Sequence, residues 1–123
     1  MIKTRIQTYS VIAGSTACNA KCPYCVSRMT PKVGLDYKIS EPNWRNFEKG
    51  CEYAKDSGVS TVLITGKGEP TLFPDQISDY LTHLENYKFP FIEMQTNGIT
   101  LAKQQEKMKP YLKDWYDKGL TTF

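Results

Sequence analysis

Short apolar runs alternate with amphipathic segments along this chain. Residues 6–13, 60–65 and 91–96 are each rich in β-branched or aromatic side chains, and a glycine-containing loop or turn follows each run. Runs of this length bounded by turn residues are typical of β-strands. The segment STVLIT at residues 60–65 is short and largely apolar, as in a buried strand of a parallel sheet. The pattern therefore predicts three strands.

The segment between the first two predicted strands has helical periodicity. Apolar side chains recur every three or four residues at Trp44, Phe47, Cys51 and Ala54. We expect Ser40 to cap this helix, since Glu41 and Pro42 suit a first helical turn. Ile39 and Trp44 have the spacing of a hydrophobic staple, and Gly58 is expected to end the helix.

Two further helical regions follow. Residues 74–87 carry an apolar face formed by Ile77, Tyr80, Leu81 and Leu84. The turn signal Asn97-Gly98 closes the third predicted strand, and a third helical region comes after it. We expect that region to be interrupted at Pro110 and to end near Gly119. Residues 119–123 have the character of the start of a fourth strand.

Strands and helices thus alternate, which predicts an α/β fold built on a parallel sheet with right-handed crossovers. In such sheets, ligands bind at the carboxyl ends of the strands, where the loops of neighbouring β/α units meet. Three unusual loops directly follow the predicted strands: a cysteine-containing loop, residues 66–70 and residues 96–98. We therefore expect these loops to form one shared site.

Composition narrows the class of protein. The chain has 123 residues, at most one domain, with 40% hydrophobic and 24% charged residues, as in an ordinary soluble globular protein. The net charge of +3 is spread along the chain and does not indicate a nucleic-acid partner. Neither a secretory signal nor a run of about 18 apolar residues occurs, so we expect a cytoplasmic protein without membrane contact. Thiols stay reduced there, which favours metal binding or chemistry over disulfides.

The cysteines carry the strongest chemical signal. Cys18, Cys22 and Cys25 fall within CNAKCPYC, a CxxxCxxC pattern. Thiolates select zinc, copper(I) or iron–sulfur clusters, and three of them on a [4Fe–4S] cluster would leave one iron open for a non-protein ligand. A closed zinc site needs four ligands, so a partial zinc or redox site is the alternative. We interpret Cys51 as a buried apolar residue and His83 as a surface or packing residue.

The cysteine spacing resembles the signature of the radical S-adenosylmethionine (SAM) enzymes, in which an aromatic residue such as Tyr24 often precedes the third cysteine. The resemblance implies a [4Fe–4S] cluster ligated by Cys18, Cys22 and Cys25, with SAM chelated to the open iron and Tyr24 near the adenine. It further implies reductive cleavage of SAM to a 5′-deoxyadenosyl radical that abstracts hydrogen from a substrate. The electron would come from a donor such as flavodoxin or ferredoxin.

Two later motifs extend the resemblance. GKGEP at residues 66–70 is similar to the family's GGEP motif, which contacts the methionine amino group, although Lys67 replaces its usual first glycine. Glycine lets the backbone approach a ligand closely, and Pro70 biases Glu69 towards an extended conformation. QTNG at residues 95–98 resembles the family's TNG, whose polar side chains face SAM. The resemblance therefore implies SAM contacts from Gly66, Lys67, Gly68, Glu69, Thr96 and Asn97.

The resemblance spans nearly the whole chain but only part of the family's fold. A full (β/α)₈ barrel takes about 250 residues, and radical SAM enzymes resemble a six-unit partial barrel. Residues 1–123 would then be the amino-terminal part of a radical SAM core domain, with roughly the first three to four β/α units. We expect a truncated chain, incomplete at its carboxyl end, with an unpaired sheet edge and an uncovered apolar face.

Two interpretations of partner and class remain open from the sequence. The longer string GEPTLFP resembles the tRNA wyosine-base synthases within the family. The substrate is otherwise unidentified, and this similarity implies tRNA as one candidate. The alternative from a different class is a non-catalytic metal-binding or iron–sulfur electron-transfer module that uses the same three cysteines without SAM. The second and third loop motifs favour the enzyme, because a simple carrier needs no further ligand loops.

Overall fold

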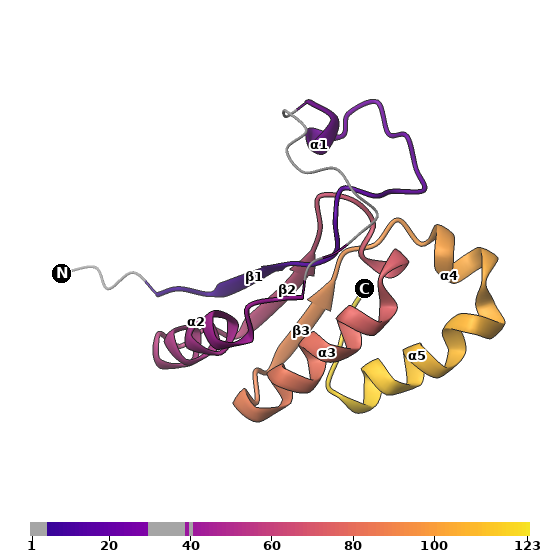
Figure 1. Cartoon of the computed structure of the whole chain (residues 1–123). Coiled ribbons are helices and arrows are strands. Elements are labelled where there is room, and N and C mark those ends of the chain that lie inside the picture. Colours follow the sequence, from indigo (N-terminus) through magenta and orange to yellow (C-terminus); the bar gives the residue numbers. More distant parts are fainter. Residues whose placement is uncertain (1–4, 30–38, 40) are drawn as a thin grey trace.

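A computed structural model describes residues 5–29, 39 and 41–123 of the chain. Strands and helices alternate along it (Figure 1). The elements are β1 (Thr8–Ile12), α1 (Val26–Met29), α2 (Trp44–Asp56), β2 (Thr61–Thr65), the 3₁₀ helix η1 (Pro70–Leu72), α3 (Pro74–Leu84), the 3₁₀ helix η2 (Glu85–Tyr87), β3 (Phe91–Met94), α4 (Ile99–Lys103) and α5 (Gln105–Asp117).

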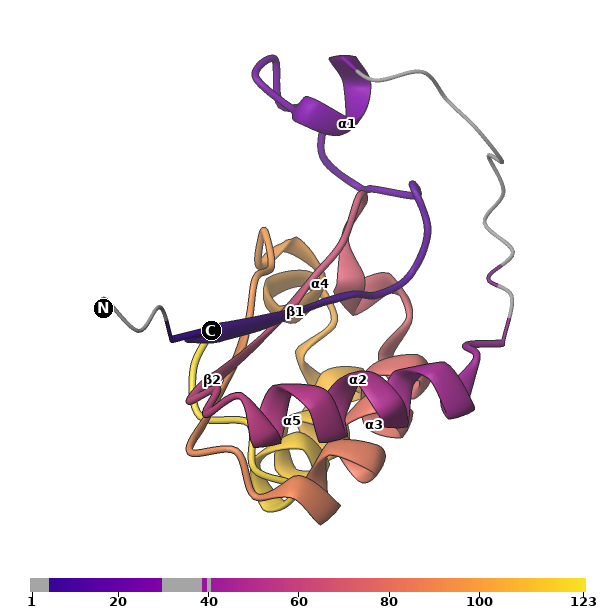
Figure 2. The same ribbon diagram turned by 90° about the vertical axis from the view of Figure 1, so that its left-hand side faces the viewer.

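The three strands form a parallel sheet in the order β1-β2-β3. Thr8 pairs with Thr61, which pairs with Phe91, so the strands start level, and β3 ends one residue before β1 and β2. Helices α2 and α3 form the two crossovers, and together with α5 they cover one side of the sheet (Figures 1 and 2). The predicted α/β class is confirmed, as three β/α units of a partial (β/α) barrel.

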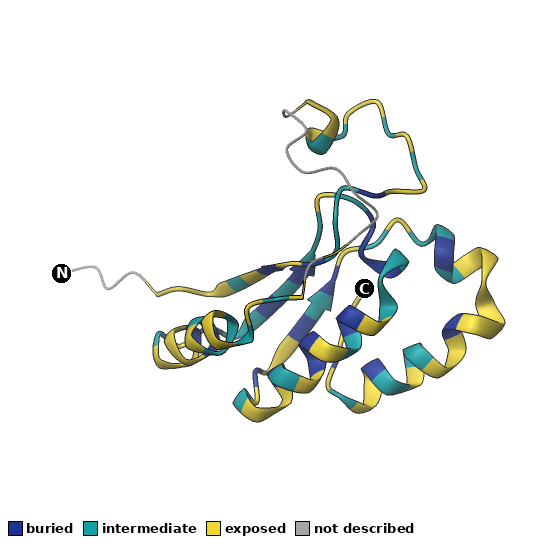
Figure 3. Ribbon diagram, viewed as in Figure 1, coloured by how far each residue is buried: buried dark blue, intermediate teal, exposed yellow. Residues whose placement is uncertain are grey.

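The core lies between the sheet and these helices (Figure 3). Alternate strand residues point into it, among them Val62, Ile64 and Met94. The predicted inner face of α3 is also buried there, and it consists of Ile77, Tyr80, Leu81 and Leu84. Trp115 of α5 is fully buried, and its indole Nε1 donates to Ser78 Oγ at 2.9 Å. Strong burial on one face fixes the strand register, because a slip of one residue would turn this face outwards.

The other face of the sheet is open and mixed in character, which corrects the expected apolar face. Its rows are Thr8, Thr61 and Phe91, then Ser10, Leu63 and Glu93, then Ile12 and Thr65. Polar and apolar residues thus share this face, and Ile12 and Phe91 are the exposed large apolar ones. In a (β/α) barrel this side of the strands lines the interior.

The predicted start of a fourth strand is present as a single parallel bridge beside β3. Glu93 pairs with Thr122, and Met94 N donates to Thr122 O at 3.0 Å. Leu120 packs into the core immediately before this bridge. The chain after α5 therefore returns along the edge of the sheet in the direction of the other strands.

The ends of α2 correct one prediction and confirm another. The N-cap is Asn43, whose side chain accepts a hydrogen bond from Asn46 N at 3.1 Å, and the predicted cap Ser40 lies outside the described residues. Gly58 ends the helix as predicted, with φ of +80°. Val59 N donates to Ala54 O and Gly58 N to Lys55 O, which is the Schellman arrangement.

The third helical region breaks at Gln104 and not at Pro110, where the interruption was predicted. Gln104 has φ of −122° and ψ of 45° between α4 and α5, whereas Pro110 lies inside α5. Proline removes one helical hydrogen bond. Burial of Met108 and Trp115 on either side of Pro110 outweighs that loss. In the described parts of the chain, no helix combines the length and apolar character of a membrane span.

Candidate functional site

The loops after β1 and β2 are joined backbone to backbone. Gly68 N donates to Ser15 O at 3.0 Å, and Glu69 N donates to Ala17 O at 2.9 Å. Both loops leave the same end of the sheet and run side by side there (Figures 1 and 2). Their contact places the segment just before Cys18 against the GKGEP motif. The predicted convergence of these two loops is confirmed.

Glycine is required where the two loops touch. A Cβ atom on Gly68 would lie 2.0 Å from Ala17 O, and one on Gly66 would lie 2.9 Å from Ala13 O. Lys67 between them is exposed, and its carbonyl accepts a hydrogen bond from the Ser27 hydroxyl. A side chain is therefore tolerated at position 67, where the family motif usually has glycine, because it faces away from the β1 loop contact.

Glu69 connects the β2 loop to the β3 loop. Its carboxylate is buried, and Oε1 accepts from Thr71 N at 3.1 Å, Thr71 Oγ1 at 2.7 Å and Thr96 Oγ1 at 2.5 Å. The second oxygen, Oε2, accepts from Asn97 N at 2.8 Å. Two of these partners are backbone N–H groups and two are hydroxyls, so the carboxylate can accept all four hydrogen bonds. The side chain predicted to contact SAM is thus occupied in holding two loops together.

The turn after β3 is ordered by its own polar groups. Gly98 has φ of +76°, and its N–H donates to Thr96 Oγ1 at 3.1 Å. Asn97 Oδ1 accepts from Ile99 N at 3.0 Å, at the start of α4. Asn97 Nδ2 donates to Asn19 Oδ1 at 2.9 Å and to Cys18 Sγ at 3.8 Å. The third loop therefore meets the cysteine loop directly.

The three clustered cysteines are free thiols on a loop that extends past the ends of the strands (Figures 1 and 2). Cys25 N donates to Cys22 O at 3.2 Å, so these two share one turn, whereas Cys18 lies beside the β3 loop. Among the described residues, no three Cys, His, Asp or Glu side chains are arranged to hold a metal ion. The donor set suits an iron–sulfur cluster, and gathering the three sulfurs requires the loop to change conformation.

Of the other residues considered in the sequence, Tyr24 lies on the cysteine loop, whereas Cys51 and His83 pack in or against the core. Tyr24 is 78% exposed on the cysteine loop. Cys51 is fully buried in the core, and burial raises the pKa of its thiol to about 12, which confirms it as an apolar residue. His83 stacks on Trp44 at 4.0 Å between ring centroids and bonds Glu48 Oε1 through Nδ1 at 2.9 Å, which confirms a packing role.

Three polar residues at this rim were not anticipated from the sequence. Asn19 Oδ1 accepts a hydrogen bond from Asn97 and so joins the cysteine loop to the β3 turn. The Ser27 hydroxyl donates to the Lys67 carbonyl. Gln76 Oε1 of α3 accepts a hydrogen bond from Gly14 N at 2.7 Å. Asn19 and Ser27 lie next to or near the cysteines in sequence, which was the available signal. Gln76 is a buried polar residue on an otherwise apolar helix face, which sequence periodicity does not distinguish.

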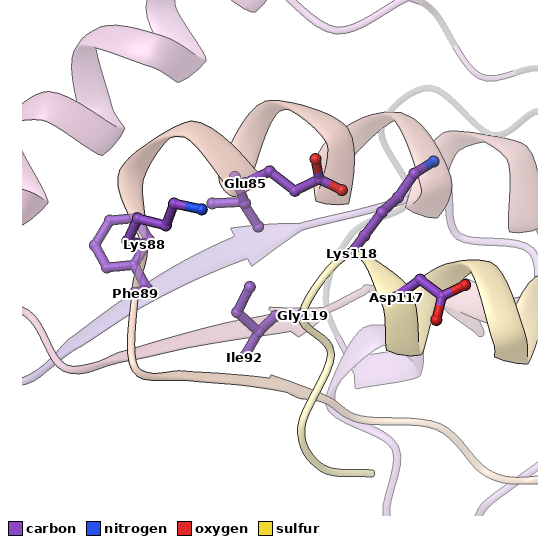
Figure 4. Close-up of a pocket in the computed structure, with 8 residues that line it drawn as sticks. Glu85, Lys88, Phe89, Ile92, Asp117, Lys118 and Gly119 are labelled. Carbon is purple, nitrogen blue, oxygen red and sulfur yellow. The ribbon is translucent and has the colours of Figure 1, made fainter.

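A separate pocket of about 290 Å³ lies at the opposite end of the sheet (Figure 4). It is bordered by the ends of α3 and α5 and by Phe89 and Ile92 near the start of β3. The charged residues around it are Glu85, Lys88, Asp117 and Lys118. The three loops of the candidate site follow the carboxyl ends of the strands and contribute no lining residue.

Comparison with known proteins identifies the family of this chain. The family model of the Radical SAM superfamily matches residues 12–123, and the chain belongs to this superfamily. Members generally use a [4Fe–4S] cluster and SAM, and they need a substrate and a reductant. The comparison with solved structures found no match.

The similar curated proteins carry one name. The chain is 32% identical over 111 residues to the mitochondrial GTP 3′,8-cyclase of Arabidopsis thaliana, covering 85% of this chain and 26% of the relative. It is 33% identical over 105 residues to a probable GTP 3′,8-cyclase of Archaeoglobus fulgidus (85% and 32%). It is 30% identical over 121 residues to the GTP 3′,8-cyclase of Limosilactobacillus fermentum (97% and 35%). The chain thus spans between a quarter and about a third of each relative.

Proposed function

We propose that the chain is the part of a radical SAM enzyme that holds a [4Fe–4S] cluster on Cys18, Cys22 and Cys25. Residues 1–123 would form the amino-terminal part of the core domain, in keeping with the limited share of each relative that they cover. The observation that carries the proposal is the hydrogen-bonded meeting of three loops, each with a family-like motif, at the carboxyl ends of neighbouring strands.

The three thiolates would hold the cluster, and the cluster with SAM supplies reductive cleavage to a 5′-deoxyadenosyl radical that abstracts hydrogen from the substrate. Thiolates are the soft ligands that such a cluster requires. With three protein ligands, one iron of the cluster would stay open for SAM. Tyr24, which is exposed on the same loop, would pack against the adenine.

The other loops would bind and orient SAM. The β2 loop offers the backbone of Gly66, Lys67 and Gly68, and glycine at the last of these lets the chain pass close to the cysteine loop. Glu69 holds the β3 turn through its buried carboxylate, which fixes where Thr96 and Asn97 lie. Polar groups of that turn would face the cofactor. Restricting their positions beforehand reduces the ordering cost of binding.

For the substrate, GTP is the first candidate to test, because the three relatives named above are GTP 3′,8-cyclases. Transfer RNA stays as the second candidate, from the string GEPTLFP. Equilibrium binding of GTP to the reconstituted chain, with ATP and tRNA as competitors, separates the two. A reductant such as flavodoxin or ferredoxin would provide the electron.

Cluster assembly tests the ligand set. After anaerobic reconstitution with iron and sulfide, we expect the chain to hold one [4Fe–4S] cluster, measured by iron and sulfide content and by electron paramagnetic resonance of the dithionite-reduced protein. Cys18→Ala, Cys22→Ala and Cys25→Ala should each assemble little cluster. Cys51→Ala is the matched control and should assemble as much as the unmodified chain, because Cys51 lies in the core.

Addition of SAM distinguishes the enzyme from the non-catalytic alternative. We expect the resonance signal of the reduced cluster to change shape when SAM is added, since SAM would bind the open iron. A cluster that forms but does not respond to SAM would favour an electron carrier. Tightly bound zinc on the same cysteines, unaffected by SAM, would contradict the proposal.

A further inference from the structure

The side-chain amide of Asn97 is fixed in orientation by contacts on both of its ends. Oδ1 accepts from Ile99 N at 3.0 Å, which leaves Nδ2 as the end that faces the cysteine loop. Nδ2 donates to Asn19 Oδ1 at 2.9 Å and reaches Cys18 Sγ at 3.8 Å. The backbone of Asn97 is held in turn by Glu69 Oε2 at 2.8 Å. The donor therefore points at one particular sulfur.

Cys18 is held on both sides by contacts to the rest of the rim. Its neighbour Ala17 is buried, and the carbonyl of Ala17 accepts from Glu69 N at 2.9 Å. On the other side, Asn19 Nδ2 donates to the buried Thr100 at 3.1 Å. Cys22 and Cys25 lie farther along the loop, where the Ser27 hydroxyl donates to the Lys67 carbonyl. Because Cys18 lies between two contacts to the rest of the rim, a cluster on its sulfur would form next to the Asn97 donor.

We propose that Asn97 donates an N–H···S hydrogen bond to the Cys18 sulfur and thereby raises the reduction potential of the cluster, with Glu69 as the positioning residue for that donor. The inference rests on the proposed function, because it requires a cluster on Cys18. Reduction by one electron adds negative charge to the cluster and its thiolates. A donor aimed at a thiolate stabilises the more negative state, which makes reduction easier.

The test is a spectroelectrochemical titration of the reconstituted full chain without SAM. At the midpoint potential of the unmodified protein, we expect Asn97→Ala to lower the ratio of reduced to oxidised cluster about fivefold, the effect of losing one ordinary hydrogen bond. Asn97→Asp keeps an oxygen for Ile99 N but replaces the donor by a negative charge. It should lower the ratio at least as much. Because SAM is absent, a residue that only contacts SAM would leave the ratio unchanged.

Two further variants test the positioning and the specificity of the effect. Glu69→Gln should shift the ratio in the same direction, because an amide cannot accept from all of the donors that now hold the β3 turn. Asn86→Ala, on an exposed residue of η2 at the far end of α3, is the matched control and should leave the potential unchanged.

Each remaining outcome counts against the inference. Unchanged potentials in Asn97→Ala and Asn97→Asp, with cluster contents equal to the unmodified chain, overturn the tuning role while leaving the proposed function intact. Loss of the cluster in both variants also overturns it, because Asn97 would then be needed to hold the loop. Failure of the unmodified chain to assemble any cluster contradicts the proposed function and this inference together.

Discussion

At the scale of single residues, Glu69 does the most to define the site. One buried carboxylate accepts hydrogen bonds from Thr71, Thr96 and Asn97, which belong to two different loops. Such a charge stabilises a fold only with its complete set of donors, because an unpaired buried polar group costs free energy. Its role in the structure is to join loops.

Glu69→Gln should lower the free energy of unfolding by about 1–3 kcal/mol, because the amide NH₂ would face donors and leave one of them unpaired. Urea denaturation followed by circular dichroism measures this loss. Glu85→Gln, at an exposed position of η2, is the control and should change little. Equal stability of the two variants would contradict the assigned role of Glu69.

Alkaline pH should reveal the ionisation of Tyr9, which is half-buried against the core, and of Cys51, which is fully buried. Burial raises the pKa of each group to about 12, from ordinary values of 10.0 for Tyr9 and 9.0 for Cys51. Both groups ionise at lower pH in the unfolded chain, so their contribution to the free energy of unfolding should be constant below about pH 9 and fall as pH rises towards about 12. Urea denaturation at several pH values measures the slope. Cys51→Ala should make that slope shallower, and an unchanged slope would contradict the assignment.

At the scale of elements, the helix ends follow local side-chain chemistry. Asn43 caps α2 through Asn46 N, and Gly58 ends it in a Schellman arrangement with a positive φ. The cap was predicted at Ser40 because serine followed by glutamate and proline fits the same sequence pattern. Two cap-competent residues lie close together there, and the sequence alone does not rank them. In the structure, the helix begins at Trp44, which packs against the core, and Asn43 directly before it is the cap.

Asn43→Ala should destabilise the protein by about 1 kcal/mol, because the first turn of α2 loses its side-chain acceptor. Asn46→Ala is the matched control, since Asn46 takes part through its backbone and lies at an exposed helical position. It should stay within about 0.5 kcal/mol of the unmodified chain. Thermal unfolding of both variants checks this, and the reverse order of stability would disprove the cap.

At the scale of the whole molecule, the site exists because a parallel sheet brings distant segments to one rim. The β1, β2 and β3 loops are separated by whole helices in sequence, yet all leave the sheet at its carboxyl end. The contact between the first two depends on close backbone approach at Gly68. The face of the sheet that the helices leave open corresponds to the face that lines the interior of a (β/α) barrel.

Gly68→Ala tests how far the site depends on this approach. A Cβ atom 2.0 Å from Ala17 O must push the two loops apart, so cluster assembly should fall and stability should drop by about 1–3 kcal/mol. Gly66→Ala, with its nearest backbone contact at 2.9 Å, should have a smaller effect on both. Iron content after reconstitution and urea denaturation measure the two quantities. A Gly68→Ala chain that assembles cluster normally would show that the loops do not need to touch.

Local signals in the sequence predicted most of the elements and the candidate chemistry. The β-branched runs, the apolar face of α3, the stop at Gly58 and the turn at Asn97-Gly98 all depend on neighbours a few residues apart, and the structure confirms them. The alternation of strand and helix predicted the parallel sheet and hence the common rim. The break at Gln104 was missed because proline is the stronger local signal, although burial around Pro110 outweighs it.

What only the tertiary structure decided are the contacts between segments far apart in sequence. The sequence by itself determined the strands, the three clustered thiols and the glycines of the β2 loop. It did not determine that the Glu69 carboxylate is buried against the β3 turn, that Asn97 reaches Cys18, or that Lys67 faces outwards. The physical reason is that a hydrogen bond between loops depends on where whole strands and helices lie, and packing of the core sets that position.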